Sequence, residues 1–146
     1  MKHFPQKDAD ALLKMEKQPV DDRVWHYPPQ GQTIIIPLRS ADEREEFILD
    51  IKRYRIDLER RTYQNRARQS IILGRVDIRG PLHENPDGET IGLPHIHVYR
   101  EGYGDKWAYP LPPEVFKNPD DPMQILDDFL VYCRVTPQPR FVGSWC

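Results

Sequence analysis

Two histidines separated by one residue, His95 and His97, are the side chains of this sequence best suited to chemistry. They lie in PHIHVYR, residues 94–100, where polar and apolar side chains alternate. A period of two is the pattern of a strand, and it places both imidazoles and Tyr99 on one side of a sheet. Because an imidazole titrates near neutral pH and also ligates metals, three interpretations compete. They are acid–base catalysis or anion binding, a metal site, and a structural pair.

The metal interpretation needs more than this pair, because His95 and His97 supply only two ligands. His83 or Glu84, in the loop before the strand, is the candidate for a third ligand. A divalent transition metal held by His83, His95 and His97 is therefore kept as an alternative. The favoured expectation is that the protein has no metal and no other cofactor.

A row of charges follows in a second predicted strand, residues 69–79, QSIILGRVDIR. The alternation puts Arg75, Asp77 and Arg79 on one face of that strand. Charged groups in a sheet are unusual unless they are paired, so this row either pairs internally or is functional. If it shares a sheet face with His95 and His97, one surface combines guanidinium and imidazole groups.

The most basic segment is RTYQNRAR, residues 61–68, with three arginines in eight residues. One interpretation is a solvated loop. The other is an arm that grips phosphate, because the guanidinium fork matches phosphate oxygens and a tyrosine can stack on a base. In that case Tyr63, Arg66 and Arg68 contact the ligand.

The elements that position these residues predict an α+β fold, with a curved, mostly antiparallel sheet of about six strands flanked by an N-terminal and a C-terminal helix. Asp121 is the expected N-cap of the second helix, and Pro122 its first residue. The expected helices are residues 8–17 and 118–135, and the expected strands are residues 33–38, 46–52, 54–60, 69–79, 94–100 and 106–111. We expect a single domain, residues 1–146, with an N-terminal helix and loop (1–32), the sheet (33–112), the C-terminal helix (118–135) and an irregular tail (136–146).

Composition limits the classes of function. The chain has 146 residues, 30% of them charged, and a formal net charge of −2. This balance excludes general attraction to nucleic acid, so only a local basic face can bind it. The sequence has no apolar run long enough to span a bilayer, and MKHFPQKDAD at its start lacks an apolar signal core. Together with only two cysteines, these features predict a cytoplasmic protein without membrane partners.

Several motifs together resemble a family of uncharacterised bacterial proteins. They are TYQNR (62–66), RVDI (75–78), GP (80–81), His83, NPDG (85–88) and PHIHVYREGYGDKWAYPL (94–111). The resemblance covers residues 62–112 and extends to the C-terminal helix, and it implies no established activity. A looser similarity links Pro94, His95, His97 and Val98 to small toxin-like bacterial proteins with a Pro-Pro-His-x-His-Val motif. Those proteins are suspected members of toxin–antitoxin modules. Leu93 stands here where their first proline lies.

The leading functional hypothesis is a metal-independent ribonuclease of the toxin type, from a toxin–antitoxin or phage-defence module. RNA is then the substrate and a cognate antitoxin a possible partner. The catalytic residues are His95 and His97 as base and acid, with Tyr99 and Arg75. The residues expected to contact phosphate or bases are Tyr63, Arg66, Arg68, Arg79, Lys106 and Trp107. The alternative is a non-enzymatic interaction protein, such as an antitoxin, immunity or defence component, that uses the same surface.

Overall fold

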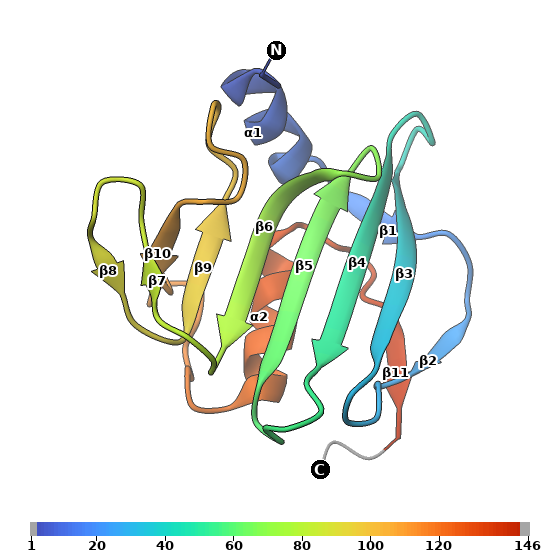
Figure 1. The fold of residues 1–146 in the computed structure, drawn as a ribbon. Coiled ribbons are helices and arrows are strands. Elements are labelled where there is room, and N and C mark those ends of the chain that lie inside the picture. Colours follow the sequence, from blue (N-terminus) through green and yellow to red (C-terminus); the bar gives the residue numbers. More distant parts are fainter. Residues whose placement is uncertain (1–2, 144–146) are drawn as a thin grey trace.

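The computed structural model describes residues 3–143 and has the expected α+β fold (Figure 1). Its helices are α1 (Gln6–Lys14) and α2 (Pro122–Tyr132). Its strands are β1 (Lys17–Pro19), β2 (Val24–His26), β3 (Thr33–Ser40), β4 (Glu46–Arg53), β5 (Arg61–Ala67), β6 (Ile71–Ile78), β7 (His83–Glu84), β8 (Thr90–Ile91), β9 (His95–Val98), β10 (Ala108–Pro110) and β11 (Arg140–Val142).

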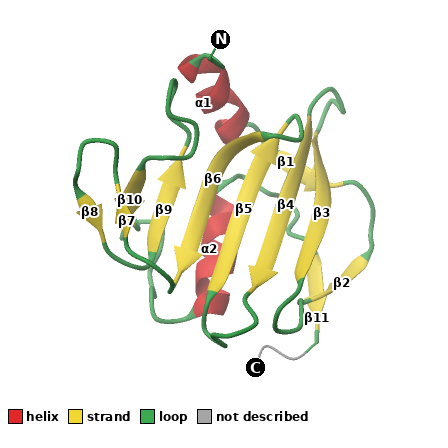
Figure 2. Cartoon of the chain, in the orientation of Figure 1, coloured by secondary structure: helices red, strands yellow, loops and turns green. Residues whose placement is uncertain are grey.

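Seven of the described strands form one antiparallel sheet in the order β1-β3-β4-β5-β6-β9-β10, one more strand than about six expected (Figure 2). Two small sheets pair β7 with β8 and β2 with β11. The β2–β11 pair corrects the prediction of an irregular tail, because residues 140–142 run parallel to β2. The last three residues of the expected tail, 144–146, fall outside the described residues.

Helix α2 covers one face of the sheet and leaves the other face open (Figure 1). It begins as expected, because the Asp121 side chain accepts hydrogen bonds from the backbone N–H groups of Met123 and Gln124. Helix α1 begins at Gln6, two residues before the expected start, and Pro5 stands at its N-cap without a side-chain bond. The core lies between the helices and the sheet. Its helical residues are Ala9, Leu12, Ile125, Leu126, Phe129 and Leu130.

Residues 61–67 of the basic segment form β5 at the centre of the sheet, which corrects the interpretation of this segment as a solvated loop. Buried and half-buried residues alternate along it without a break. Tyr63 is fully buried and donates a hydrogen bond to the carbonyl of Pro122, 2.9 Å away. The alternation therefore decides the structure of this segment, and the number of arginines does not.

Residues 54–60, expected to be a strand, form the connection between β4 and β5. The two strands pair directly, and the N–H of Tyr54 bonds to the carbonyl of Arg60 at the neck of the loop. Ile56 is 96% exposed, so this apolar side chain of the apparent alternation does not pack against the core. Asp57 stabilises the turn by accepting from the N–H of Glu59.

Lys17, expected at the end of the first helix, is instead a fully buried residue of β1. Its ammonium donates to the carbonyls of Leu13, Met15 and Cys133 at distances of 2.9, 2.9 and 2.8 Å. It therefore binds the C-terminal ends of α1 and α2, where carbonyl groups lack helical partners. Burial lowers the pKa of Lys17 to about 8. Neither helix in the described part of the chain is long and apolar enough to cross a membrane.

Candidate functional site

Two rows of polar side chains cross the open face of the sheet. The strand registers place side by side Lys52, Thr62, Asp77 and His95 in one row, and Asp50, Gln64, Arg75 and His97 in the other. Each row takes one residue from β4, β5, β6 and β9. The rows arise because every second residue of these strands points away from α2, so the helix-covered face receives the apolar residues between them. Sequence positions far apart are thereby brought to one surface.

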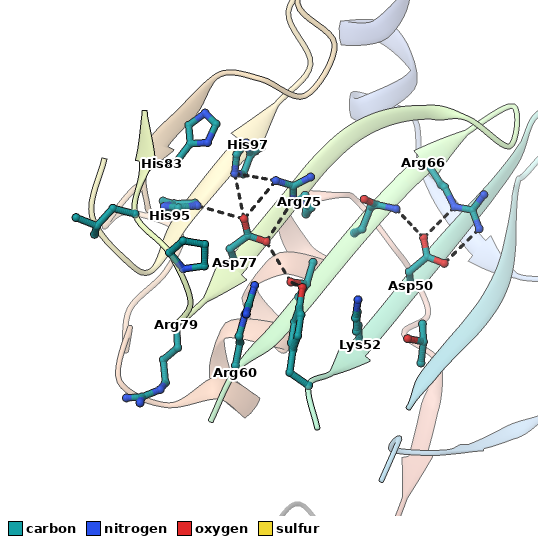
Figure 3. A pocket seen from close by; sticks show the side chains of 16 residues that line it. Asp50, Lys52, Arg60, Arg66, Arg75, Asp77, Arg79, His83, His95 and His97 are labelled. Carbon is teal, nitrogen blue, oxygen red and sulfur yellow. Dashed lines mark hydrogen bonds and ion pairs between the residues drawn. The ribbon is translucent and has the colours of Figure 1, made fainter. Parts of the chain in front are cut away.

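A cavity of about 520 Å³ lies over these rows (Figure 3). Tyr54 and Arg60 line it from the β4–β5 connection, and Arg79 and His83 line it from the segment after β6. Five cationic side chains and two carboxylates line the cavity: Lys52, Arg60, Arg66, Arg75 and Arg79, with Asp50 and Asp77. A protein with a net charge of −2 thus has an excess of positive charge in this cavity.

Asp77 is the centre of the first cluster in the cavity. Its Oδ2 lies 3.2 Å from Nε2 of His95 and 3.1 Å from Nε2 of His97. Its Oδ1 accepts from Nε of Arg75 at 3.2 Å and from the Thr62 hydroxyl at 3.1 Å. Burial acts to raise the pKa of Asp77, but the two imidazoles and the charge of Arg75 outweigh burial and hold this pKa far below its ordinary value. The carboxyl group is therefore ionised.

The other nitrogen of each imidazole faces a backbone carbonyl. Nδ1 of His95 lies 2.9 Å from the oxygen of Gly92, and Nδ1 of His97 lies 2.7 Å from the oxygen of Asp105. A carbonyl oxygen only accepts, so both Nδ1 atoms carry a proton. Both side chains are 1% exposed. The two rings are therefore fixed in the floor of the cavity with Nε2 directed at Asp77.

His83 lies beside these rings but is directed elsewhere. Its Nε2 donates to the backbone carbonyl of Lys106 at 2.6 Å, and its ring meets that of His97 edge to face at 4.6 Å between centroids. The cluster of described groups that converge as metal ligands is Asp77, His95 and His97. The third residue near His95 and His97 that could bind a metal is thus Asp77, and not His83 as the metal-site alternative expected.

Three of the five cations in the cavity are paired. Arg66 binds Asp50 through Nε at 2.9 Å, and Gln64 donates to the same carboxylate at 3.0 Å. Arg75 also binds Asp105 at 2.6 Å. Arg79 binds the Asp57 carboxylate at 2.8 Å. These pairs hold three guanidinium groups in position on the open face of the sheet.

Lys52 and Arg60 differ from the other cations, because within residues 3–143 neither makes an ion pair with a carboxylate. Both lie against the ring of Tyr54. The Lys52 ammonium is 4.5 Å from the ring centroid, and the Arg60 guanidinium is 3.9 Å from it. The Tyr54 hydroxyl is 3.1 Å from that of Thr62, which fixes the ring. The cavity thus presents two positive charges that form no ion pair with a carboxylate in the described part of the chain.

Of the sequence-predicted site residues, the cavity brings together His95, His97, Arg75, Arg66 and Arg79. It does not include Tyr99, which was expected on the same face as the histidines. β9 ends at Val98, so the alternation stops there. The Tyr99 hydroxyl donates to the carbonyl of Phe4, and its ring belongs to the core.

Four of the expected ligand contacts also lie outside the cavity lining. Tyr63 is buried on the helix-covered face. Arg68 lies in the turn after β5 and is paired with Glu45 at 3.0 Å. The Lys106 side chain is exposed, and Trp107 packs against Tyr103 and Arg100. The places of Tyr63 and Arg68 follow from β5 being a strand that ends at Ala67.

Ten cavity residues were not predicted as site residues: Thr33, Asp50, Lys52, Tyr54, Arg60, Thr62, Gln64, Asp77, Pro81 and Leu82. For four of them, in β4 and β5, the sequence carried a signal. Thr62, Gln64 and Arg66 alternate with Tyr63 and Asn65, which is a strand with one polar face. Lys52 and Asp50 likewise alternate with apolar residues of β4.

Comparison with known proteins places the sequence in one group. The sequence model of one protein family matches residues 4–135. The chain belongs to this family, a family of unknown function (DUF6978). The match includes both helices and every lining residue of the cavity. No curated protein and no solved structure matches the chain. Membership in DUF6978 agrees with the resemblance to an uncharacterised family and assigns no activity.

Proposed function

We propose that the cavity on the open face of the sheet binds RNA through its phosphate groups. The observation that carries this proposal is the pair of cations, Lys52 and Arg60, that line the cavity without a carboxylate partner in the described chain. Lys52 is exposed and Arg60 is half-buried, so a ligand in the cavity can reach both charges. Phosphate is the anion that arginine and lysine bind in nucleic acids.

The shape and composition of the cavity support the same proposal. A volume of about 520 Å³ lies within the range of small-molecule sites, roughly 300–1,000 Å³, so it can hold part of one nucleotide unit. Guanidinium groups of Arg66, Arg75 and Arg79 surround it and are already oriented by carboxylates. Preorganised donors cost less conformational entropy on binding than free side chains.

The proposal concerns binding and includes no cleavage step by the histidines. Each imidazole of His95 and His97 has one nitrogen on a backbone carbonyl and the other against Asp77, and both side chains are buried. A general acid or base has to reach the proton that it transfers. Of the toxin-type ribonuclease hypothesis, the proposal therefore keeps RNA binding and leaves out RNA cleavage.

The test is a titration of the protein into a fluorescently labelled single-stranded RNA of ten nucleotides, followed by fluorescence anisotropy. We expect the double variant Lys52→Glu, Arg60→Glu to bind at least about tenfold more weakly than the wild type, because two phosphate contacts become repulsions. We also expect the affinity of the wild type to fall as salt rises, since phosphate contacts release counterions.

The matched control is the double variant Lys7→Glu, Lys117→Glu, which makes the same change in net charge at exposed positions outside the cavity lining. It should bind RNA within about threefold of the wild type, because its charges lie beyond the ligand. Equal weakening in the two double variants would reduce the effect to net charge and refute the pocket. Absence of RNA binding in the wild type would favour the non-enzymatic interaction protein instead.

A further inference from the structure

Asp77, His95 and His97 form a compact group of possible metal ligands at the floor of the cavity (Figure 3). The side-chain nitrogen and oxygen atoms that they offer lie within 4.8 Å of one another. The three residues come from β6 and β9, two paired strands, so the backbone fixes their spacing. Two histidines and one carboxylate are a common ligand set for divalent transition metals.

The hydrogen bonds of His95 leave one atom without a suitable partner. Nδ1 carries the proton, because it faces the carbonyl of Gly92 at 2.9 Å. In the neutral ring Nε2 is then an acceptor, and it points at the ionised carboxylate of Asp77 at 3.2 Å. Two acceptors in contact repel each other unless a proton or a cation lies between them.

His97 repeats this pattern with one difference. Its Nδ1 donates to the carbonyl of Asp105, and its Nε2 faces the same Asp77 oxygen at 3.1 Å. Nη2 of Arg75 lies 3.0 Å from this Nε2 and 3.3 Å from Oδ2 of Asp77, so the guanidinium bridges these two atoms. The guanidinium is a donor only, so it requires Nε2 of His97 to be an acceptor. The unprotonated form of Nε2 is therefore the one that fits its neighbours.

A second proton on each imidazole is the competing explanation, because each Nε2 would then donate to Asp77. Two imidazolium ions would then lie 4.9 Å apart between ring centroids, with the Arg75 guanidinium beside them. The carboxylate of Asp77 would face all three charges, and the second carboxylate, Asp105, pairs with Arg75. Like charges that close in a buried site raise the energy of the folded state. One bound metal ion satisfies all three acceptor atoms at once.

We propose that Asp77, His95 and His97 bind a divalent transition-metal ion. Ligand atoms at about 2.1 Å from one ion in a tetrahedral arrangement are roughly 3.4 Å apart. The observed separations of 3.2 and 3.1 Å between Asp77 and the two imidazoles come near this value. Arg75 keeps its bonds to Asp105 and to Oδ1 of Asp77 when its Nη2 gives way to the ion.

The carbonyl groups behind the imidazoles support this ligand set. A metal-bound histidine usually donates its remaining N–H to a carbonyl or carboxylate, which fixes the tautomer and the ring. Gly92 and Asp105 provide this second contact for His95 and His97. Three protein ligands leave at least one coordination position on the ion. The Asp77 side chain is 22% exposed and the His95 side chain 1%, so the open position would lie on the cavity side of Asp77.

This inference goes beyond RNA binding and does not depend on it, so it is tested without RNA. Protein freed of metal by a chelator is titrated with ZnCl₂ by calorimetry, and with CoCl₂ while the visible absorption of the cobalt ion is recorded. We expect one ion per chain and cobalt bands typical of low coordination number. His95→Ala and Asp77→Asn should each weaken zinc binding by at least roughly 100-fold.

The matched control is His83→Ala, which removes a neighbouring imidazole outside the ligand cluster. It should change the affinity by less than about threefold. The folding of each variant is checked by circular dichroism, and Asp77→Asn, which preserves shape, keeps the test valid if His95→Ala unfolds. Absence of zinc and cobalt binding to the wild type would overturn the proposal. Zinc affinities of His95→Ala and Asp77→Asn equal to that of the wild type would also overturn it.

A second readout distinguishes a metal ligand from a charged imidazole pair. Long-range ¹H–¹⁵N spectra report whether each imidazole nitrogen carries a proton. We expect a large change of the ¹⁵N shift of Nε2 in His95 when zinc is added. Protons on both nitrogens of His95 that persist in the presence of zinc would overturn the proposal.

Discussion

Replacing Lys17 by methionine should lower the free energy of unfolding by about 3 kcal/mol. The ammonium group is fully buried and donates to carbonyls of Leu13, Met15 and Cys133. Methionine has a similar shape but no donor, so three carbonyl groups at the ends of α1 and α2 lose their partner. A buried carbonyl group without a hydrogen-bond partner costs the free energy of its desolvation, and here three carbonyl groups lose their partner.

Chemical denaturation at pH 7 measures this effect, and Lys14→Met provides the matched control. Lys14 is exposed at the end of α1, so the same change of residue type removes a charge without leaving a buried group unpaired. It should change the free energy of unfolding by less than about 0.5 kcal/mol. A Lys17→Met variant as stable as Lys14→Met would contradict the role given to the buried ammonium.

The lowered pKa of Lys17 also predicts a dependence on pH. In the folded protein this pKa is about 8, below the ordinary value of 10.5, because burial disfavours the charged form. Between these two values the unfolded chain binds a proton that the folded chain has released. The contribution of Lys17 to stability therefore rises with pH across this window and is constant below it. The difference between wild type and Lys17→Met, measured from pH 7 to 10.5, should show this rise.

Replacing Asp77 by alanine in the metal-free protein should lower the free energy of unfolding by about 3 kcal/mol. The carboxylate is the acceptor for Arg75 and Thr62, and both imidazoles face it. Its removal leaves a half-buried guanidinium with Asp105 as its remaining anion. Breaking a buried ionic network by removing one member is costly because the other charges stay behind.

Asp77→Asn should cost only about 1 kcal/mol, because the amide presents its N–H group to the Nε2 acceptors of the histidines and keeps an oxygen for Arg75. The control Asp120→Ala removes a carboxylate from an exposed position and should be within about 0.5 kcal/mol of wild type. Thermal and denaturant unfolding compare the three variants. A loss of 1 kcal/mol or less in Asp77→Ala would contradict the view that this carboxylate organises the cavity floor.

The hairpin that carries the histidines was predictable from the sequence, because alternation and glycines act locally. Within PHIHVYR, residues 95–98 form β9, and residues 108–110 form its partner β10. The N-cap of α2 was equally local, since Asp121 and Pro122 determine it within one turn. The α+β fold followed from the order of these elements, although the number of strands in the main sheet is seven.

The site was predictable only in part, because strand pairing is not local. Arg75 and the histidines lie together because β6 pairs with β9, and no local pattern specifies that register. The charged residues of segment 61–68 favoured the interpretation as a loop over a strand, so Thr62 and Gln64 were not predicted as site residues. Tyr99 was misplaced because the end of β9 at Val98 depends on the turn that follows.

The most direct test of RNA binding by the open face is a residue-by-residue map of the contact. Uniformly ¹⁵N-labelled protein is titrated with the ten-nucleotide RNA, and backbone amide shifts are followed by ¹H–¹⁵N spectra. The account predicts that the largest changes fall on the β4–β5 connection and on the central strands at Lys52, Arg60 and Gln64, with little change in α2. Changes centred on α2 or on the β2–β11 sheet, or no change at saturating RNA, would contradict it.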